Sequence, residues 1–89
     1  MKSVVTVLGN DRIGIIAEIT KVFYECQVNI DNINQAILDD LFTMVMVVNM
    51  KDMTLPFETL QERLSSVSTR LGVDIRIQKY EIFQNMHSI

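Results

Sequence analysis

The segment Leu8–Ile15, with the sequence LGNDRIGI, joins a run of apolar residues to an amphipathic stretch. The residues before it, Ser3–Leu8, are rich in valine, which is typical of a β-strand. The residues after it are apolar at intervals of three and four as far as Cys26, which predicts a helix. Asp11 precedes this helical pattern and is a candidate N-cap. The segment is therefore predicted to turn the chain from a first strand into a first helix.

Two further strands follow. Val28–Leu38 alternates apolar and polar residues, but the alternation slips by one residue, which predicts a bulge or bend near Asp31–Asn32. Asp39–Asp40 is predicted to be a tight turn. Phe42–Met50 carries apolar residues on both faces, so we expect a central strand that is covered on both sides.

The last third of the chain predicts a second helix and a fourth strand. Phe57–Leu71 has apolar residues at helical spacing, with Thr54 as a possible cap and Pro56 in the first turn. Gly72 is placed to end this helix. Val73–Gln78 alternates strictly between apolar and polar residues, which indicates a strand that is wet on one face.

The predicted order is strand, helix, strand, strand, helix, strand. Right-handed crossovers then favour an α+β, ferredoxin-like βαββαβ sandwich, with a four-stranded antiparallel sheet in the order 4-1-3-2 and both helices on one face. We assign residues 1–80 to this domain and residues 81–89 to a C-terminal helical tail. Apolar residues at helical spacing support the tail helix, namely Ile82, Phe83, Met86 and Ile89.

This arrangement leaves the second face of the sheet without helices. Depending on the phase of each strand, the apolar residues on that open face could be Val4, Leu8, Val45 and Val47. An uncovered apolar patch usually marks an interface, so a homodimer is predicted.

Composition narrows the classes of function. The chain has 89 residues, a net charge of −3 and a sequence pI of about 4.9, which argues against nucleic acid as a partner. The N-terminus lacks the features of a signal peptide, and no apolar run is long enough to span a membrane, so a cytoplasmic location is expected. A single cysteine, Cys26, and a single histidine, His87, do not make a structural zinc site, and no cofactor is expected.

Two chemical interpretations of the LGNDRIGI segment are weak. Gly9 and Gly14 have the spacing of a phosphate-binding loop, but Ile15 and Ile16 stand where that loop needs a lysine and a hydroxyl group. Catalysis is disfavoured because no nucleophile lies near a base in the sequence, and Cys26 belongs to the apolar stripe of the first helix. We therefore expect a protein that is not an enzyme.

A binding loop remains, beside a purely structural turn. The N-terminus of a helix carries a partial positive charge and unpaired N–H groups, which suit a carboxylate. The carboxylate of Asp11 could accept from an ammonium group, and Gly14 permits a close approach, so an amino acid would fit. The alternative interpretation is purely structural: Asp11 caps the helix, Gly9 turns the chain, and neither contacts a ligand. The residues alone leave both interpretations open.

The stretch GNDRIGIIAEITKVFYECQVNI, residues 9–30, resembles the signature of ACT domains, with G-x-D-R-x-G before a helix and V-N-I at the second strand. The resemblance covers about residues 2–80 and extends to small stand-alone ACT proteins, which are similar to the regulators of the glycine cleavage system. It implies a regulatory protein that binds an amino acid at a subunit interface, where the loop after the first strand faces the second strand of another subunit. The ligand-binding residues that it implies are Asn10, Asp11, Arg12, Gly14, Ile15, Asn29 and Ile30.

Two residues depart from the ACT pattern and leave the ligand open. Many ACT loops have proline where this chain has Ile13, and some amino-acid binders have a polar residue in place of Gly9. A second hypothesis is an interaction module without a small-molecule ligand. It would bind an unidentified protein through the open sheet face or the C-terminal tail.

Overall fold

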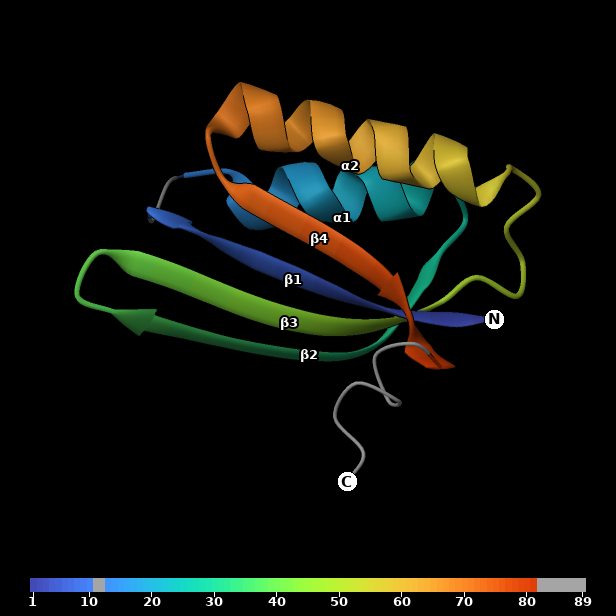
Figure 1. Ribbon diagram of the computed structural model, residues 1–89, viewed down its shortest axis with the longest axis horizontal. Coiled ribbons are helices and arrows are strands. Elements are labelled where there is room, and N and C mark those ends of the chain that lie inside the picture. Colours follow the sequence, from blue (N-terminus) through green and yellow to red (C-terminus); the bar gives the residue numbers. More distant parts are fainter. Residues whose placement is uncertain (11–12, 82–89) are drawn as a thin grey trace.

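The computed structural model describes residues 1–10 and 13–81. Figure 1 shows a twisted sheet with two helices packed on one of its faces. The elements in chain order are β1 (Lys2–Asn10), α1 (Ile15–Glu25), β2 (Asn29–Leu38), β3 (Leu41–Asn49), α2 (Phe57–Leu71) and β4 (Asp74–Lys79). Among the described residues, no helix is long and apolar enough to cross a membrane.

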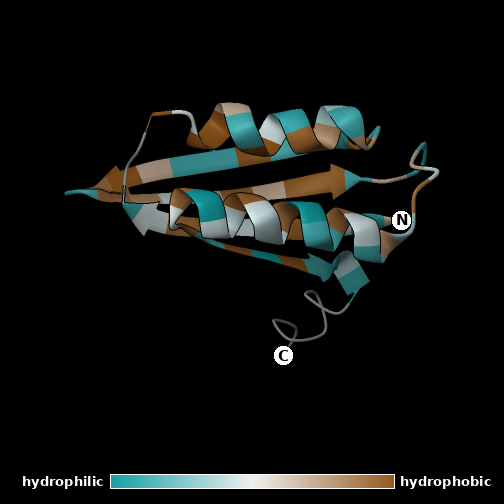
Figure 2. Ribbon diagram, turned by 90° about the horizontal axis from the view of Figure 1, so that it is seen from above, coloured by the Kyte–Doolittle hydropathy of each residue, from teal (hydrophilic) through white to brown (hydrophobic). Residues whose placement is uncertain are grey.

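The four strands pair in the order β2-β3-β1-β4, and every neighbouring pair is antiparallel. This is the predicted order 4-1-3-2 counted from the opposite edge, and both helices lie on one face, so the predicted fold class is confirmed (Figure 2). Residues 82–89, which include all four apolar positions of the predicted tail helix, lie outside the described residues.

The predicted bulge in β2 is also confirmed. The pairing of β2 with β3 shifts between Ile30 and Asn32, so that Asp31 is the extra residue. Beyond it, Ile33 and Ile37 lie opposite Met46 and Phe42, on the side of the sheet that faces the helices. Because side chains alternate along a strand, one inserted residue is enough to explain the slip seen in the sequence.

The β2–β3 hairpin closes through Asp39 and Asp40, as predicted. Asp39 has a φ of 55°, a left-handed conformation that aspartate tolerates better than most residues with a side chain. A two-residue connection needs such a positive φ to match the twist of the strands.

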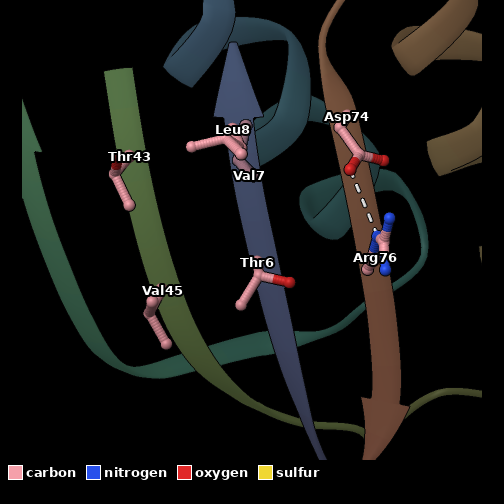
Figure 3. Close-up of a pocket in the computed structure, with 7 residues that line it drawn as sticks. All are labelled: Thr6, Val7, Leu8, Thr43, Val45, Asp74 and Arg76. Carbon is pink, nitrogen blue, oxygen red and sulfur yellow. Dashed lines mark hydrogen bonds and ion pairs between the residues drawn. The ribbon is translucent and has the colours of Figure 1, made fainter. Parts of the chain in front are cut away.

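The open face of the sheet carries the four apolar residues expected there. Val4 lies opposite Val47, and Leu8 and Val45 lie in neighbouring rows of the same face. Their exposure differs: Val4 is only 4% accessible, whereas Leu8 is 45% and Val45 is 37% accessible. Figure 3 shows Leu8 and Val45 on their neighbouring strands. β3 is central as predicted, but the expectation that both of its faces are covered is wrong at Val45.

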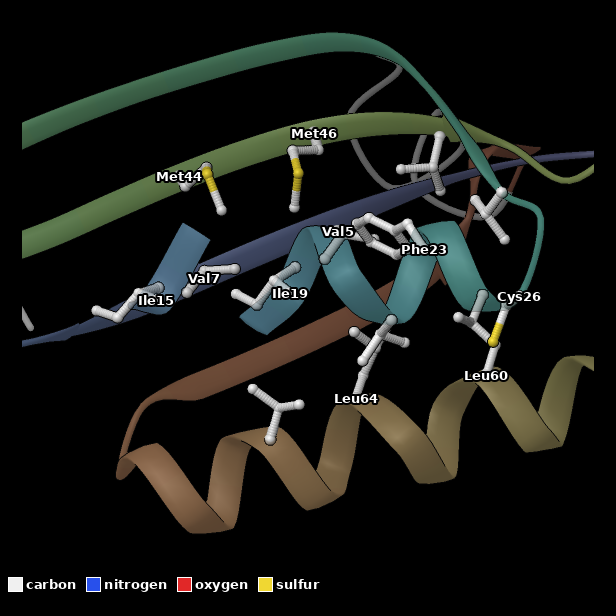
Figure 4. Packing of buried hydrophobic residues seen from close by; sticks show 14 of the residues in the cluster. Val5, Val7, Ile15, Ile19, Phe23, Cys26, Met44, Met46, Leu60 and Leu64 are labelled. Carbon is white, nitrogen blue, oxygen red and sulfur yellow. The ribbon is translucent and has the colours of Figure 1, made fainter. Parts of the chain in front are cut away.

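The core lies between the sheet and the two helices (Figure 4). α1 contributes Ile19 and Phe23, α2 contributes Leu60 and Leu64, and Met44 is one of the alternate residues of β3 that meet them. Cys26 is buried in the same cluster, in agreement with its predicted place on the apolar stripe. Each such side chain gains about 1.5–3 kcal/mol on burial, which makes this layer the main source of stability.

Both helix starts differ from the sequence expectation. The N-cap of α1 is Gly14, not Asp11, and its φ of 93° is a conformation that a side chain disfavours. The N-cap of α2 is Pro56 in an extended conformation, so Thr54 is not its cap and Pro56 precedes the first turn. The predicted end of α2 is confirmed, since Gly72 is left-handed and donates its N–H to the carbonyl of Ser68.

Gly9 has a packing role rather than a turning role. It lies within β1, opposite Phe42, and a Cβ atom added there would lie 2.8 Å from Cγ1 of Val73. Val73 is buried at the connection between α2 and β4. The missing side chain therefore lets this connection close against the sheet.

We expect Gly9→Ala to destabilise the protein by about 1–3 kcal/mol, the usual effect of overpacking a core. Urea unfolding measures the change. Val73→Ala removes the nearest clashing atom, so the double variant should lose less stability than the sum of the two single variants. Additive losses would contradict the proposed contact.

Candidate functional site

The expected site residues fall into two groups at opposite ends of the sheet. Asn10 lies opposite Leu41, which in turn lies opposite Leu38, the last residue of β2. Asn29 lies opposite Asn49 at the other end of that strand. Eight residue steps along β1 separate the two ends, about 26 Å at roughly 3.3 Å per residue. A single chain therefore does not bring the two groups together.

The first group surrounds the N-terminus of α1. Asn10 is exposed at the end of β1, and the N-cap Gly14 makes no side-chain hydrogen bond. Ile15 is 1% exposed and packs in the core, so only its backbone N–H is placed to face a ligand. Asp11 and Arg12 lie outside the described residues. The first N–H groups of any helix have no partner within the helix, and together with the partial positive charge of that end they suit a carboxylate.

The second group lies at the start of β2, where polar side chains gather around the bulge. Asn29 donates from Nδ2 to Oδ1 of Asp31 over 2.8 Å, and Nζ of Lys2 lies 3.2 Å from Oδ2 of Asp31. The hydrogen bond from Asn29 and the ammonium of Lys2 lower the pKa of the Asp31 carboxyl below its ordinary value of 3.8. A hydrogen bond with Asn49 also helps to lower the pKa of the Asp31 carboxyl. Ile30, the other predicted site residue on β2, turns inward and packs against the core.

A surface cavity of about 450 Å³ adjoins Asn29. Its lining residues are Phe23, Tyr24, Gln27, Val28, Asn29 and Asp52. The Asp52 carboxylate and the amide oxygens of Gln27 and Asn29 are hydrogen-bond acceptors, and the ring of Tyr24 is 85% exposed beside them. Acceptors next to an aromatic face suit an ammonium group.

The sequence did not point to Lys2, Asp31, Asn49, Tyr24 or Asp52. Lys2 and Asp31 come together only because β1 and β2 both pair with β3 in a particular register. The predicted bulge was the one available signal, because an extra polar residue in an otherwise alternating strand often re-aims a side chain.

Among residues 1–10 and 13–81, no three or more His, Cys, Asp or Glu side chains gather where they could hold a metal ion.

Comparison with known proteins identifies related chains. A family model described as an ACT domain matches residues 3–78. A UPF0237 protein of Neisseria meningitidis serogroup B is 41% identical over 87 residues, which cover 98% of this chain and 97% of that protein.

Solved structures of related proteins have a similar fold. An ACT domain protein from Streptococcus pneumoniae superposes with a TM-score of 0.80 at 38% identity, and the match covers 94% of each chain. A putative glycine cleavage system transcriptional repressor superposes with a TM-score of 0.75 at 20% identity, over 88% of this chain and 44% of that one. At that identity the second likeness shows the fold alone.

The lowered pKa of Asp31 makes a prediction about acid stability. A carboxyl group with a depressed pKa in the folded state stabilises the fold above its unfolded pKa, and this contribution is lost as the pH falls through the folded value. Asp31→Asn should therefore destabilise the protein at pH 7, and its deficit relative to wild type should shrink below about pH 3.8. Urea unfolding across pH 2–7 measures both. The exposed Asp40→Asn serves as a control, and a deficit for Asp31→Asn that does not change with pH would refute the ion-pair interpretation.

Proposed function

The chain belongs to the ACT domain family, and on that premise we propose that it is a regulatory protein that binds an amino acid between two copies of itself and catalyses no reaction. The coarse part of this function, ligand-responsive regulation, is what an ACT domain indicates. The ligand class, the dimer and the absence of catalysis are the proposal.

The observation that carries the proposal is that two complementary groups of residues lie at opposite ends of the sheet. We call them the carboxylate half-site and the ammonium half-site. The N-terminus of α1, next to Asn10 and Gly14, suits the carboxylate of an amino acid. The cavity beside Asn29, with Tyr24 and Asp52, suits its ammonium group. Because the two lie at opposite ends of one sheet, a complete site needs a second chain that runs in the opposite direction.

The exposed edge of β2 offers the contact that would reverse the chains. β2 has ten residues, includes no lysine, arginine or proline, and leaves the outer row of its backbone groups unpaired within the described chain. On the helix side of β2, Ile33 and Ile37 are 45% and 55% exposed, and Ile16 of α1 is also exposed. The opposite edge, β4, has only six residues and ends in Lys79. The β2 edge is therefore the better surface for pairing.

Antiparallel pairing of two β2 strands about a two-fold axis would place the start of β2 in one chain beside the end of β2 in the other. The end of β2 is the end of the sheet at which Asn10 lies. The ammonium half-site of each chain would then lie toward the carboxylate half-site of its partner. The open face, which the sequence analysis favoured as the dimer surface, stays uncovered in this arrangement.

The ligand is tested by a thermal-shift screen of the common amino acids at millimolar concentration. At a hundredfold excess over its Kd, a ligand stabilises the fold by about 2.7 kcal/mol, which is a readily measured rise in Tm. We expect Asn29→Ala and Asp52→Asn to reduce the rise, because they remove the contribution of the interface site, whereas Gln61→Ala, which alters an exposed amide on α2, should leave it undiminished. A screen without any shift, or a rise that is undiminished in both site variants, would overturn the proposed site.

The dimer is tested by sedimentation velocity at micromolar concentration. Ile37→Lys adds a charge at the β2 edge and should yield monomers, because a lysine on an edge strand opposes pairing with another strand and removes an exposed apolar contact. Val45→Lys adds the same charge to the open face and should leave the dimer intact. The reverse result would move the interface to the open face. A wild type that stays monomeric both without ligand and with the amino acid found in the screen would exclude both surfaces.

A further inference from the structure

The open face of the sheet contains a cavity of about 310 Å³ that the interface site does not use (Figure 3). It lies over two adjacent cross-strand rows, in which Thr6 has Arg76 and Val45 as neighbours and Leu8 has Asp74 and Thr43. The side chains on this face that line it are Thr6, Leu8, Thr43, Val45, Asp74 and Arg76. Its volume is at the lower end of the roughly 300–1,000 Å³ typical of small-molecule sites, so a single small molecule would fill it.

One rim of the cavity carries both signs of charge. Nε of Arg76 lies 3.2 Å from Oδ2 of Asp74, and the two side chains are 75% and 52% exposed. Nε donates to Asp74, and the guanidinium carries further N–H groups that can donate to a ligand. An exposed ion pair contributes little to stability, so rearranging it for a ligand costs little.

The rest of the cavity is apolar with two hydroxyl groups. Leu8 and Val45 are exposed and form its floor on β1 and β3. Thr6 turns its hydroxyl toward Arg76 in Figure 3, where it could donate to an anion bound by the guanidinium. An aliphatic group laid on Leu8 and Val45 would remove their side chains from water.

We propose that this cavity is a second binding site, specific for a zwitterionic α-amino acid with an aliphatic side chain. Arg76 and Thr6 bind the ligand carboxylate, Asp74 binds the ammonium, and Leu8 and Val45 hold the side chain. An α-amino acid carries its carboxylate and its ammonium group on one carbon atom, and the rim carries the opposite charges, Arg76 and Asp74, side by side. The two carboxylate oxygens match the paired N–H groups of an arginine.

The second site is complete within one chain. None of its residues belongs to β2, to the N-terminus of α1 or to the cavity beside Asn29. It therefore does not depend on the dimer, and it would be occupied in the monomeric Ile37→Lys variant. The proposed interface site cannot form in that variant, so failure of the two proposals can be told apart.

The test is a titration of the isotope-labelled full chain with L-leucine, followed by NMR through the amide signals of Thr6, Leu8, Thr43 and Val45. We expect saturable shifts in the wild type and in Asn29→Ala and Ile37→Lys. Glycine, 4-methylpentanoate and 3-methylbutylamine each lack one of the three recognised groups and should bind about tenfold more weakly.

Arg76→Gln and Asp74→Asn should each weaken L-leucine binding about tenfold, because each removes one charge-assisted hydrogen bond. Arg70→Gln is the matched control, since it breaks an exposed ion pair with Glu18 on the helix layer and should leave the affinity unchanged. Retained affinity in both site variants would overturn the proposal, and so would loss of binding in Asn29→Ala. Shifts of the same signals with protein concentration alone would assign the face to a second copy of the chain instead.

Discussion

The pairing of β3 with both of its neighbours is the constraint on which the other features depend. Met44 and Met46 lie opposite Val7 and Val5 on one side and opposite Gln35 and Ile33 on the other, and both methionines are fully buried. A slip of one residue would turn this buried face of β3 to the open side. The core therefore fixes the register, and the register fixes which polar side chains share the open face.

The bulge at Asp31 shows how the register produces a site. Without the extra residue, either Ile30 or Ile33 would turn away from the helix side, and the apolar face of β2 would be broken. With it, Asp31 reaches both Asn29 and Lys2, and a polar cluster forms at the start of β2. The same inserted residue thus preserves the core and builds the polar end of the sheet.

Much of the fold was predictable because it depends on periodicity. The alternation in Phe42–Met50 and the slip in Val28–Leu38 were enough for a central strand and a bulged edge strand. The N-cap Gly14 was missed because Asp11 has the usual side chain for a cap, whereas the observed cap depends on a positive φ. Neither the Lys2–Asp31 pair nor the cavity beside Arg76 could be predicted, because both need three strands in register.

The separation of the half-sites has a thermodynamic consequence. A ligand that needs both halves binds only the associated pair of chains, so its binding free energy adds to that of dimerisation. By the same linkage, association raises the affinity for the ligand by an equal factor. The long edge of β2, which no described strand pairs, offers backbone pairing together with the exposed side chains of Ile33 and Ile37, which is a modest apolar contact. An interface of that kind leaves room for a ligand to shift the equilibrium, whereas a large apolar interface would hold the dimer whether or not ligand was bound. Under the proposed function, the state of association would itself be the signal that this chain transmits.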